Sequence, residues 1–354
     1  MRRPAPIRWV RAAMLSRRIR REQCGVILMY HRIAPTGVDP WQLLVTPEHF
    51  AQHLEVLRHT TTPVPLRRLV AEHGRGRLAG GTVALTFDDG YVDNLTVAKP
   101  LLAAADIPAT VYVATGPTGT TREFWWDSLD RALLLPPALP PRLDLTLLGK
   151  QYHWTLGAAA TGGWDDEAAR AVSHQRAQFH LGIWSRLRPM ATADRDEAIA
   201  YLHEWSGSQT PPRQSHRVMT ADELVALESD RLIEIGAHTV THPLLPALPA
   251  DAQRSEMAAS RADLERLLGH RIWSFSYPFG GADATTTALA RSVGFESATA
   301  VHEETVWRES DGFRLPRFAV RDWDGAEFER RLTRWLRQHV APETWRGDSG
   351  RSRH

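Results

Sequence analysis

The stretch Thr82-Val83-Ala84-Leu85-Thr86-Phe87-Asp88-Asp89-Gly90 joins an apolar run to two adjacent carboxylates and a glycine. The run has the composition of a strand that is buried on both faces of a parallel sheet. Adjacent carboxylates repel each other and are costly to desolvate, so a purely structural protein gains little from the pair. The alternative at this point is a solvated turn before the next helix, because Asp-Gly is also a common turn sequence.

Six further segments have the same buried-strand character, and most of them are separated by helical patterns. They are residues 26–33, 109–114, 232–237, 273–277, 295–301 and 315–320. This alternation favours an α/β fold with a parallel sheet and helices outside, and seven strands indicate a barrel rather than an open sheet. In such barrels the chemistry lies at the carboxyl ends of the strands, which is where Asp88 and Asp89 stand.

Between about residues 116 and 219 the alternation of strands and helices stops. This segment holds two proline pairs, helical patterns near 165–187 and 192–205, and six tryptophans, at positions 125, 126, 154, 164, 184 and 205. It is too long for a loop without structure of its own. We therefore predict a largely helical insertion in a barrel domain that spans residues 25–340. Core packing explains its tryptophans better than a sugar-binding groove does, since aromatic side chains dominate cores.

The charge is small overall but uneven. A net charge of +2 argues against a nucleic-acid partner, whereas residues 1–24 form a basic leader with eight arginines, and residues 341–354 form a polar tail. The leader lacks the continuous apolar core of a secretory signal. This favours a location in the cytoplasm or at the inner face of the cell membrane. The leader would either contact anionic lipid there or stay solvated. The single cysteine, Cys24, excludes an internal disulfide framework.

His238 and His242 follow a predicted strand, four residues apart. Two neutral imidazoles and a carboxylate are typical ligands of a catalytic zinc ion, which keeps a further position open for water. The ion polarises a carbonyl and lowers the pKa of its bound water towards about 7. Of two adjacent aspartates, one can bind the ion while the other accepts a proton from the water. Tyr277-Pro278-Phe279-Gly280 can present a backbone N–H to a developing oxyanion.

Three ordered motifs resemble those of the polysaccharide deacetylase family, the chitin-deacetylase-like carbohydrate esterases. They are Thr86-Phe87-Asp88-Asp89-Gly90, His238-Thr239-Val240-Thr241-His242 and Ser276-Tyr277-Pro278-Phe279-Gly280. The resemblance covers most of residues 26–320 apart from the insertion. It implies a distorted (β/α)7 barrel and a hydrolase of non-peptide carbon–nitrogen bonds, which removes N-acetyl groups from amino sugars using a divalent metal, usually Zn²⁺.

The resemblance also implies a role for each motif residue. Asp88 would be the general base for the metal-activated water, and Asp89, His238 and His242 would be the metal ligands. The backbone N–H of Phe279 would help to hold the oxyanion.

Two family features are not found at their usual places. An arginine that orients the base is expected two residues before the motif proline, but Ser276 stands there. We predict that Arg317 supplies this guanidinium. The late leucine-x-histidine motif, whose histidine serves as general acid, is also missing. We predict His31 as its substitute, with His302 as a second candidate.

The substrate is the least determined property. Tyr30-His31-Arg32 and the tryptophan-bearing insertion resemble a bacterial branch of the family that is associated with cell-surface polysaccharide assembly. This resemblance implies an N-acetylated glycan or a lipid-linked sugar precursor as the substrate. Two alternatives stay open, because a fold or motif does not fix the substrate. One is a catalytically impaired, glycan-binding barrel, and the other is a deformylase or amidohydrolase that acts on a different amide.

Overall fold

The computed structural model describes residues 24–157 and 175–337. Its centre is a parallel sheet with the spatial order β11-β10-β9-β6-β5-β1-β12, and each of these strands overlaps one of the seven predicted ones. A short further strand, Thr62–Pro63 (β4), pairs with β5. The seven strands are Gly25–Tyr30 (β1), Thr82–Phe87 (β5), Ala109–Val113 (β6), Ile233–Ala237 (β9), Ser274–Ser276 (β10), Ser297–Thr299 (β11) and Phe318–Ala319 (β12).

The sheet curls until its two ends meet at the segment 315–319. Leu315 bridges to Thr299 beside β11, and three residues later Phe318 pairs with Leu28 of β1. The first of these junctions is only an isolated bridge, which is why the ring is irregular. The predicted distorted (β/α)7 barrel is thus confirmed.

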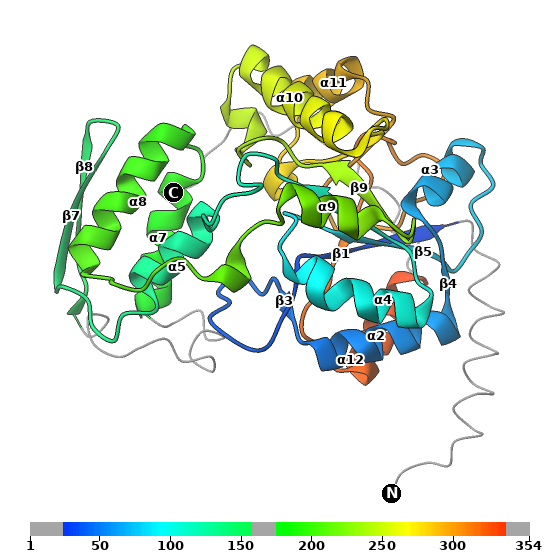
Figure 1. Cartoon of the computed structure of the whole chain (residues 1–354), viewed down its shortest axis with the longest axis horizontal. Helices are drawn as coiled ribbons and strands as arrows, with labels where there is room; N and C mark the ends of the chain where they lie inside the picture. The colour runs from blue at the N-terminus through cyan, green and yellow to red at the C-terminus, as the bar shows by residue number, and fades with distance from the viewer. Residues whose placement is uncertain (1–23, 158–174, 338–354) are drawn as a thin grey trace, which may run out of the picture.

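Helices cover the outside of the sheet (Figure 1). Two of these helices begin with side-chain caps: Thr46 Oγ1 accepts a hydrogen bond from the His49 N–H, and Thr220 forms a capping box with Glu223. A π-helical turn, Asn94–Ala98 (η1), precedes α4. The covering helices are Pro47–Thr60 (α2), Leu66–Gly74 (α3), Lys99–Ala105 (α4), Ala221–Glu228 (α9), Ala250–Leu268 (α10), Ala284–Val293 (α11) and Gly325–Trp335 (α12).

The chain between β6 and β9 forms a lobe beside the barrel (Figure 1). Its helices are Trp125–Leu133 (α5), Gln175–Leu187 (α7) and Thr192–Ser206 (α8), and a short turn, Gln214–His216 (η3), leads back to the barrel. The lobe is not only helical, because Arg142–Leu147 (β7) and Lys150–Thr155 (β8) pair as an antiparallel hairpin. Strand β7 alternates exposed and buried residues, so one face of the hairpin packs on the helices.

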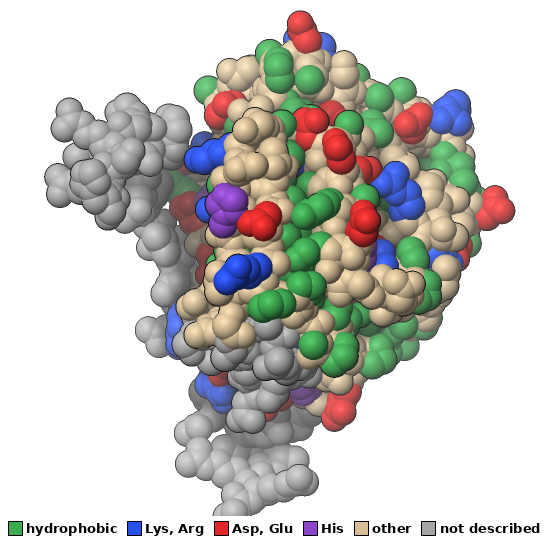
Figure 2. Space-filling model, turned by 90° about the vertical axis from the view of Figure 1, so that its left-hand side faces the viewer, with side chains coloured by type: hydrophobic (Ala, Val, Ile, Leu, Met, Phe, Trp, Pro, Cys, Tyr) green, Lys and Arg blue, Asp and Glu red, His purple; other side chains and the backbone are tan. Residues whose placement is uncertain are grey.

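Figure 2 looks onto the side of the molecule that carries this hairpin. The described residues there mix acidic, basic and hydrophobic side chains, and no large patch of one charge is visible. No helix in the described ranges is long and apolar enough to cross a bilayer. The predicted basic leader, apart from Cys24, and the polar tail lie outside the described residues, as does the first half of the predicted helical piece 165–187.

Candidate active site

The carboxyl ends of β5 and β9 bring the two predicted motifs together. Asp88 and Asp89 directly follow β5, His238 directly follows β9, and all of them are buried together with His242. Asp89 and His242 have left-handed backbones, with φ of 77° and 54°. Such conformations are uncommon for residues other than glycine and are found at functional sites, where the surrounding structure holds them.

Asp89, His238 and His242 form a compact donor set. Their ligand atoms all lie within 4.8 Å of one another. The Asp89 Oδ1 is 3.5 Å from His238 Nε2 and 3.2 Å from His242 Nε2, and the two nitrogens are 3.1 Å apart. Two imidazole nitrogens and one carboxylate oxygen are the donor chemistry that zinc prefers. The residues present therefore fit a divalent metal ion.

The surroundings of the two histidines orient their rings towards Asp89. His238 Nδ1 lies 2.7 Å from the Ser276 carbonyl oxygen, to which it donates, so its Nε2 faces Asp89 with a free lone pair. Burial lowers the pKa of His242 to about 4, although Asp89 opposes this shift. His242 is therefore able to bind a cation near neutral pH.

The loop between the histidines is fixed from outside by one carboxylate of α10. Glu256 Oε2 accepts hydrogen bonds from the backbone N–H groups of Val240 and Thr241, and its Oε1 accepts one from the Thr241 hydroxyl. A charged acceptor for two adjacent N–H groups stabilises a tight turn. This contact holds His238 and His242 at their spacing.

Asp88 is held by Arg317 through two parallel hydrogen bonds. Arg317 Nη1 and Nη2 each lie 2.7 Å from one oxygen of the Asp88 carboxylate, and Arg317 is completely buried. Burial alone would raise the pKa of Asp88, but the charge and hydrogen bonds of Arg317 outweigh it and hold this pKa below its ordinary value. Asp88 is thus an oriented, ionised carboxylate next to the donor set.

The small side chain of Ser276 allows the guanidinium of Arg317 to reach Asp88 from the segment just before β12. The Ser276 hydroxyl lies 2.9 Å from Arg317 Nη2 and 3.4 Å from Asp88 Oδ2. A small side chain at this position leaves room for the guanidinium, which enters from the segment that closes the barrel.

A cavity of about 230 Å³ opens above these groups. His31 lines it, whereas the His302 side chain lies 3.8 Å from Glu304 and is not part of the lining. Phe279 lines the cavity from the turn Pro278–Gly280 (η5), with φ of 57° and its ring 4.6 Å from that of His242. The lining residues are Met29, His31, Trp41, Leu43, Asp88, Asp89, Trp126, Trp184, His238, His242, Phe279 and Val301.

The tryptophans of the insertion divide between core and cavity. Trp126 and Trp184 line the cavity, and Trp126 lies 4.6 Å from the His242 ring, whereas Trp154 packs on Phe179 inside the lobe. Trp41 also lines the cavity and was not singled out by the sequence. It stands in the loop after Arg32–Ile33 (β2), outside any recognisable motif. Its position at the cavity is evident only from the folded structure, in which its ring packs on that of Trp184.

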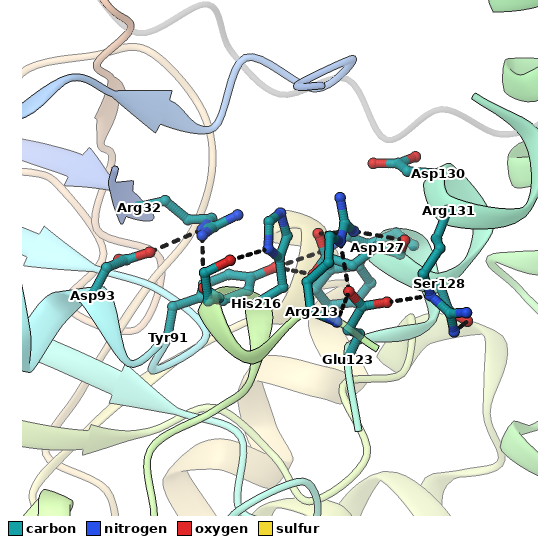
Figure 3. A network of polar contacts seen from close by, with 12 residues as sticks. Arg32, Tyr91, Asp93, Glu123, Asp127, Ser128, Asp130, Arg131, Arg213 and His216 are labelled. Atoms are coloured by element: carbon teal, nitrogen blue, oxygen red, sulfur yellow. Dashed lines mark hydrogen bonds and ion pairs between the residues drawn. The ribbon is translucent and has the colours of Figure 1, made fainter. Parts of the chain in front are cut away.

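A buried polar network joins the lobe to the barrel rim (Figure 3). Tyr91 donates from its hydroxyl to Asp127 at 2.7 Å and accepts from the indole N–H of Trp126 at 2.9 Å. Arg32 pairs with Asp93 and lies over the Tyr91 ring. Burial raises the pKa of Asp127 to about 8, with the charge of Arg32 opposing the shift. These contacts fix Trp126 beside the donor set.

The rim of this curled parallel barrel carries the Asp88–Arg317 pair and the Asp89, His238, His242 donor set. This combination is typical of hydrolases. The family model described as polysaccharide deacetylase matches residues 75–133 and 199–298, on both sides of most of the lobe. The chain therefore contains a polysaccharide deacetylase domain, and the predicted resemblance is confirmed. Members of this family hydrolyse carbon–nitrogen bonds, which confirms the predicted enzyme class. No curated protein matches the chain significantly.

Several solved structures share the fold. The Streptococcus pyogenes deacetylase PplD, in complex with acetate, is 18% identical with a TM-score of 0.55, over 87% of this chain and 98% of that one. IcaB from Ammonifex degensii is 18% identical with a TM-score of 0.55, over 90% and 98%. A de-N-acetylase from Aggregatibacter actinomycetemcomitans is 14% identical with a TM-score of 0.52, over 87% and 99%.

Proposed function

We propose that this protein is a metal-dependent hydrolase that removes N-acetyl groups from amino sugars of a polysaccharide or glycan precursor. One observation carries the proposal: the buried Asp88–Arg317 pair and the Asp89, His238, His242 donor set line or adjoin one cavity. A base beside a metal site is the arrangement that hydrolysis of an unactivated amide needs. The family match supports an N-acetylated glycan as substrate.

Each residue has a separate task in this proposal. Asp88, kept ionised by Arg317, accepts a proton from the attacking water. Asp89, His238 and His242 hold the divalent cation, with zinc as the best fit to two imidazoles and a carboxylate. When bound, the cation acts as a Lewis acid on the acyl carbonyl and makes water more acidic.

Phe279 and His31 carry out the two remaining tasks, which are stabilising the oxyanion and protonating the leaving amine. The backbone N–H of Phe279 stabilises the negative charge that develops on the carbonyl oxygen. His31, which lines the same cavity, donates a proton to the departing amine. The products are acetate and a free amino sugar.

The test combines metal content with acetate release from N-acetylated oligosaccharides. Purified protein incubated with zinc and then dialysed is expected to retain about one ion per chain and to release acetate. Asp89→Asn and His242→Ala should lose both the metal and the release, whereas Asp88→Asn should keep the metal and lose the release. The exposed Asp106→Asn and His153→Ala serve as matched controls that change neither.

The outcomes separate the alternatives. Metal and activity retained in Asp89→Asn and His242→Ala would show that the site assignment is wrong. Oligosaccharide binding without release in the wild-type protein would identify a glycan-binding barrel. Inert acetylated sugars together with cleavage of a formyl amide or cyclic imide would identify another amidohydrolase.

A further inference from the structure

The rim of the cavity carries an aromatic wall, which we define as Trp41, Trp126, Trp184 and Phe279. Its members come from separate places around the barrel. Trp41 follows β1 and β2, Trp126 and Trp184 belong to the lobe after β6, and Phe279 follows β10. In the sheet, β5 lies between β1 and β6, and β9 lies between β6 and β10.

Trp184 joins these places into one continuous wall. Its ring lies 4.5 Å from that of Trp41 on one side and 5.9 Å from that of Phe279 on the other. The first contact joins a residue from the β1 side of β5 to the lobe, and the second joins the lobe to a residue from the β10 side of β9. One continuous aromatic wall therefore borders the cavity that Asp88, Asp89 and the two histidines line.

The wall is fixed from behind by polar and cation–π contacts. The Tyr91 hydroxyl accepts the indole N–H of Trp126, and the Arg188 guanidinium lies 4.8 Å from the centre of the Trp184 ring. A buried hydrogen bond and a stacked cation restrict the movement of both rings. The wall is part of the folded structure and needs no ligand to form.

The other side of the cavity has no such wall among the described residues. From the end of β11 the described chain contributes only Val301 to the lining, with 42% of its surface exposed, and from β12 it contributes nothing. The volume of about 230 Å³ is also below the roughly 300–1,000 Å³ of sites for drug-sized ligands. The cavity has space for an acyl group and the sugar that carries it, and among the described residues its side without an aromatic wall lies towards β11 and β12.

We propose that the cavity takes an N-acylated amino sugar end-on, so that the reacting sugar is a terminal unit or stands alone. This inference rests on the proposed function. A chain that crosses the site would need space for a neighbouring sugar on both sides, and the aromatic wall occupies one of them. The rest of the substrate leaves over the β11–β12 side. Each event consumes one water and gives one acetate and one free amine, so each chain yields a single acetate.

The experiment uses N-acetylglucosamine oligomers from the dimer to the hexamer with the zinc-loaded full chain. Acetate released at completion is counted per chain, and mass spectrometry of the product locates the free amine. We expect one acetate per chain at every length and the amine on a terminal unit. Several acetates per chain or internal amines would overturn end-on binding while leaving the proposed function intact. Release from none of the oligomers would overturn the proposed function, and this inference with it.

A variant of the wall gives an independent measurement. Trp184→Ala removes both contacts that close the rim, and we expect its acetate count per hexamer to rise above one. Trp154→Ala, in the same lobe but outside the cavity lining, is the matched control and should keep the wild-type count. A Trp184→Ala protein that binds zinc normally and still gives one terminal amine would show that the wall does not set the binding mode.

Discussion

Arg317 uses all of its hydrogen-bond donors inside the barrel. Its Nε donates to the Ala300 carbonyl, its Nη1 to Thr86 and Asp88, and its Nη2 to Asp88 and Ser276. These five bonds equal the number of N–H groups that a guanidinium carries. The planar fork thus fixes both oxygens of Asp88, which a point charge cannot do.

Arg317→Lys should lower kcat by about 100-fold, because a small displacement of the base is enough for such a loss. The metal content should stay at the wild-type value, since Arg317 contacts none of the three metal ligands in the bonds described above. Steady-state kinetics and metal analysis check this together. Arg308→Lys, on an exposed side chain, is the control. A lysine variant with wild-type kcat would remove Arg317 from the mechanism.

The Asp89, His238, His242 donor set could be predicted from the sequence because its members stand in short motifs directly after strands. Asp89 and the His238–His242 pair come together because the carboxyl ends of β5 and β9 lie at the same end of the parallel sheet. Arg317 was predicted only because Ser276 stands where the family resemblance leads us to expect an arginine. Its contact with Asp88 depends on how the barrel closes. Trp41 could not be found, because its place depends on a contact with Trp184, more than a hundred residues away along the chain.

At the scale of elements, α2 docks on the barrel through a buried histidine. His53 Nε2 donates to the Trp323 carbonyl at 2.7 Å, its Nδ1 accepts from the Tyr30 hydroxyl at 3.3 Å, and its ring stacks on Phe328 of α12. This pattern requires the neutral imidazole. Burial lowers the pKa of His53 to about 4, with the Trp323 hydrogen bond opposing the shift.

Acidification should therefore weaken the docking of α2. Because the folded-state pKa lies below the unfolded value of about 6.5, the unfolded chain binds more protons, and stability is lost as the pH falls below 6.5. Between pH 6.5 and 5 the free energy of unfolding should drop by up to about 2 kcal/mol, at about 1.4 kcal/mol per pH unit. Urea unfolding of wild type and His53→Gln measures this. Parallel pH profiles of the two proteins would contradict it.

The hairpin β7–β8 was not predicted from the sequence. Its strands alternate in burial, but they lie in a segment rich in proline that was assigned as largely helical. Leu143, Leu145 and Leu147 are buried, and β7 lies against α8. Local pattern alone could not separate this hairpin from an irregular connection.

At the scale of the molecule, shared buried charges hold together the two ends of the lobe, where it leaves the barrel and where it returns. Glu123 accepts hydrogen bonds from Arg131 on one oxygen and from the backbone and side chain of Arg213 on the other. Both arginines also donate to backbone carbonyls nearby, at Thr210 and Asp127. The acid therefore ties α5 to the segment before η3, which leads back into the barrel (Figure 3).

Glu123→Gln should destabilise this junction by about 3–5 kcal/mol, since it leaves two largely buried cations without their counter-charge. Denaturant unfolding measures the loss, and amide hydrogen exchange should rise more in α5, α7 and α8 than in the barrel strands. Asp196→Asn, which breaks the exposed pair with Arg122, is the control and should change stability by less than about 1 kcal/mol. Equal effects of the two substitutions would contradict the structural role of Glu123.

The closing segment 315–319 has a consequence for how the protein becomes active during synthesis. It holds the last strand of the sheet to leave the ribosome, and it carries Arg317 into contact with Asp88. A nascent chain that ends before it already contains Asp88, Asp89 and both histidines, but Asp88 has no counter-ion. With Asp88 as the proposed base, the site is complete only once the ring closes, so a chain with an open barrel would lack activity even where it binds metal.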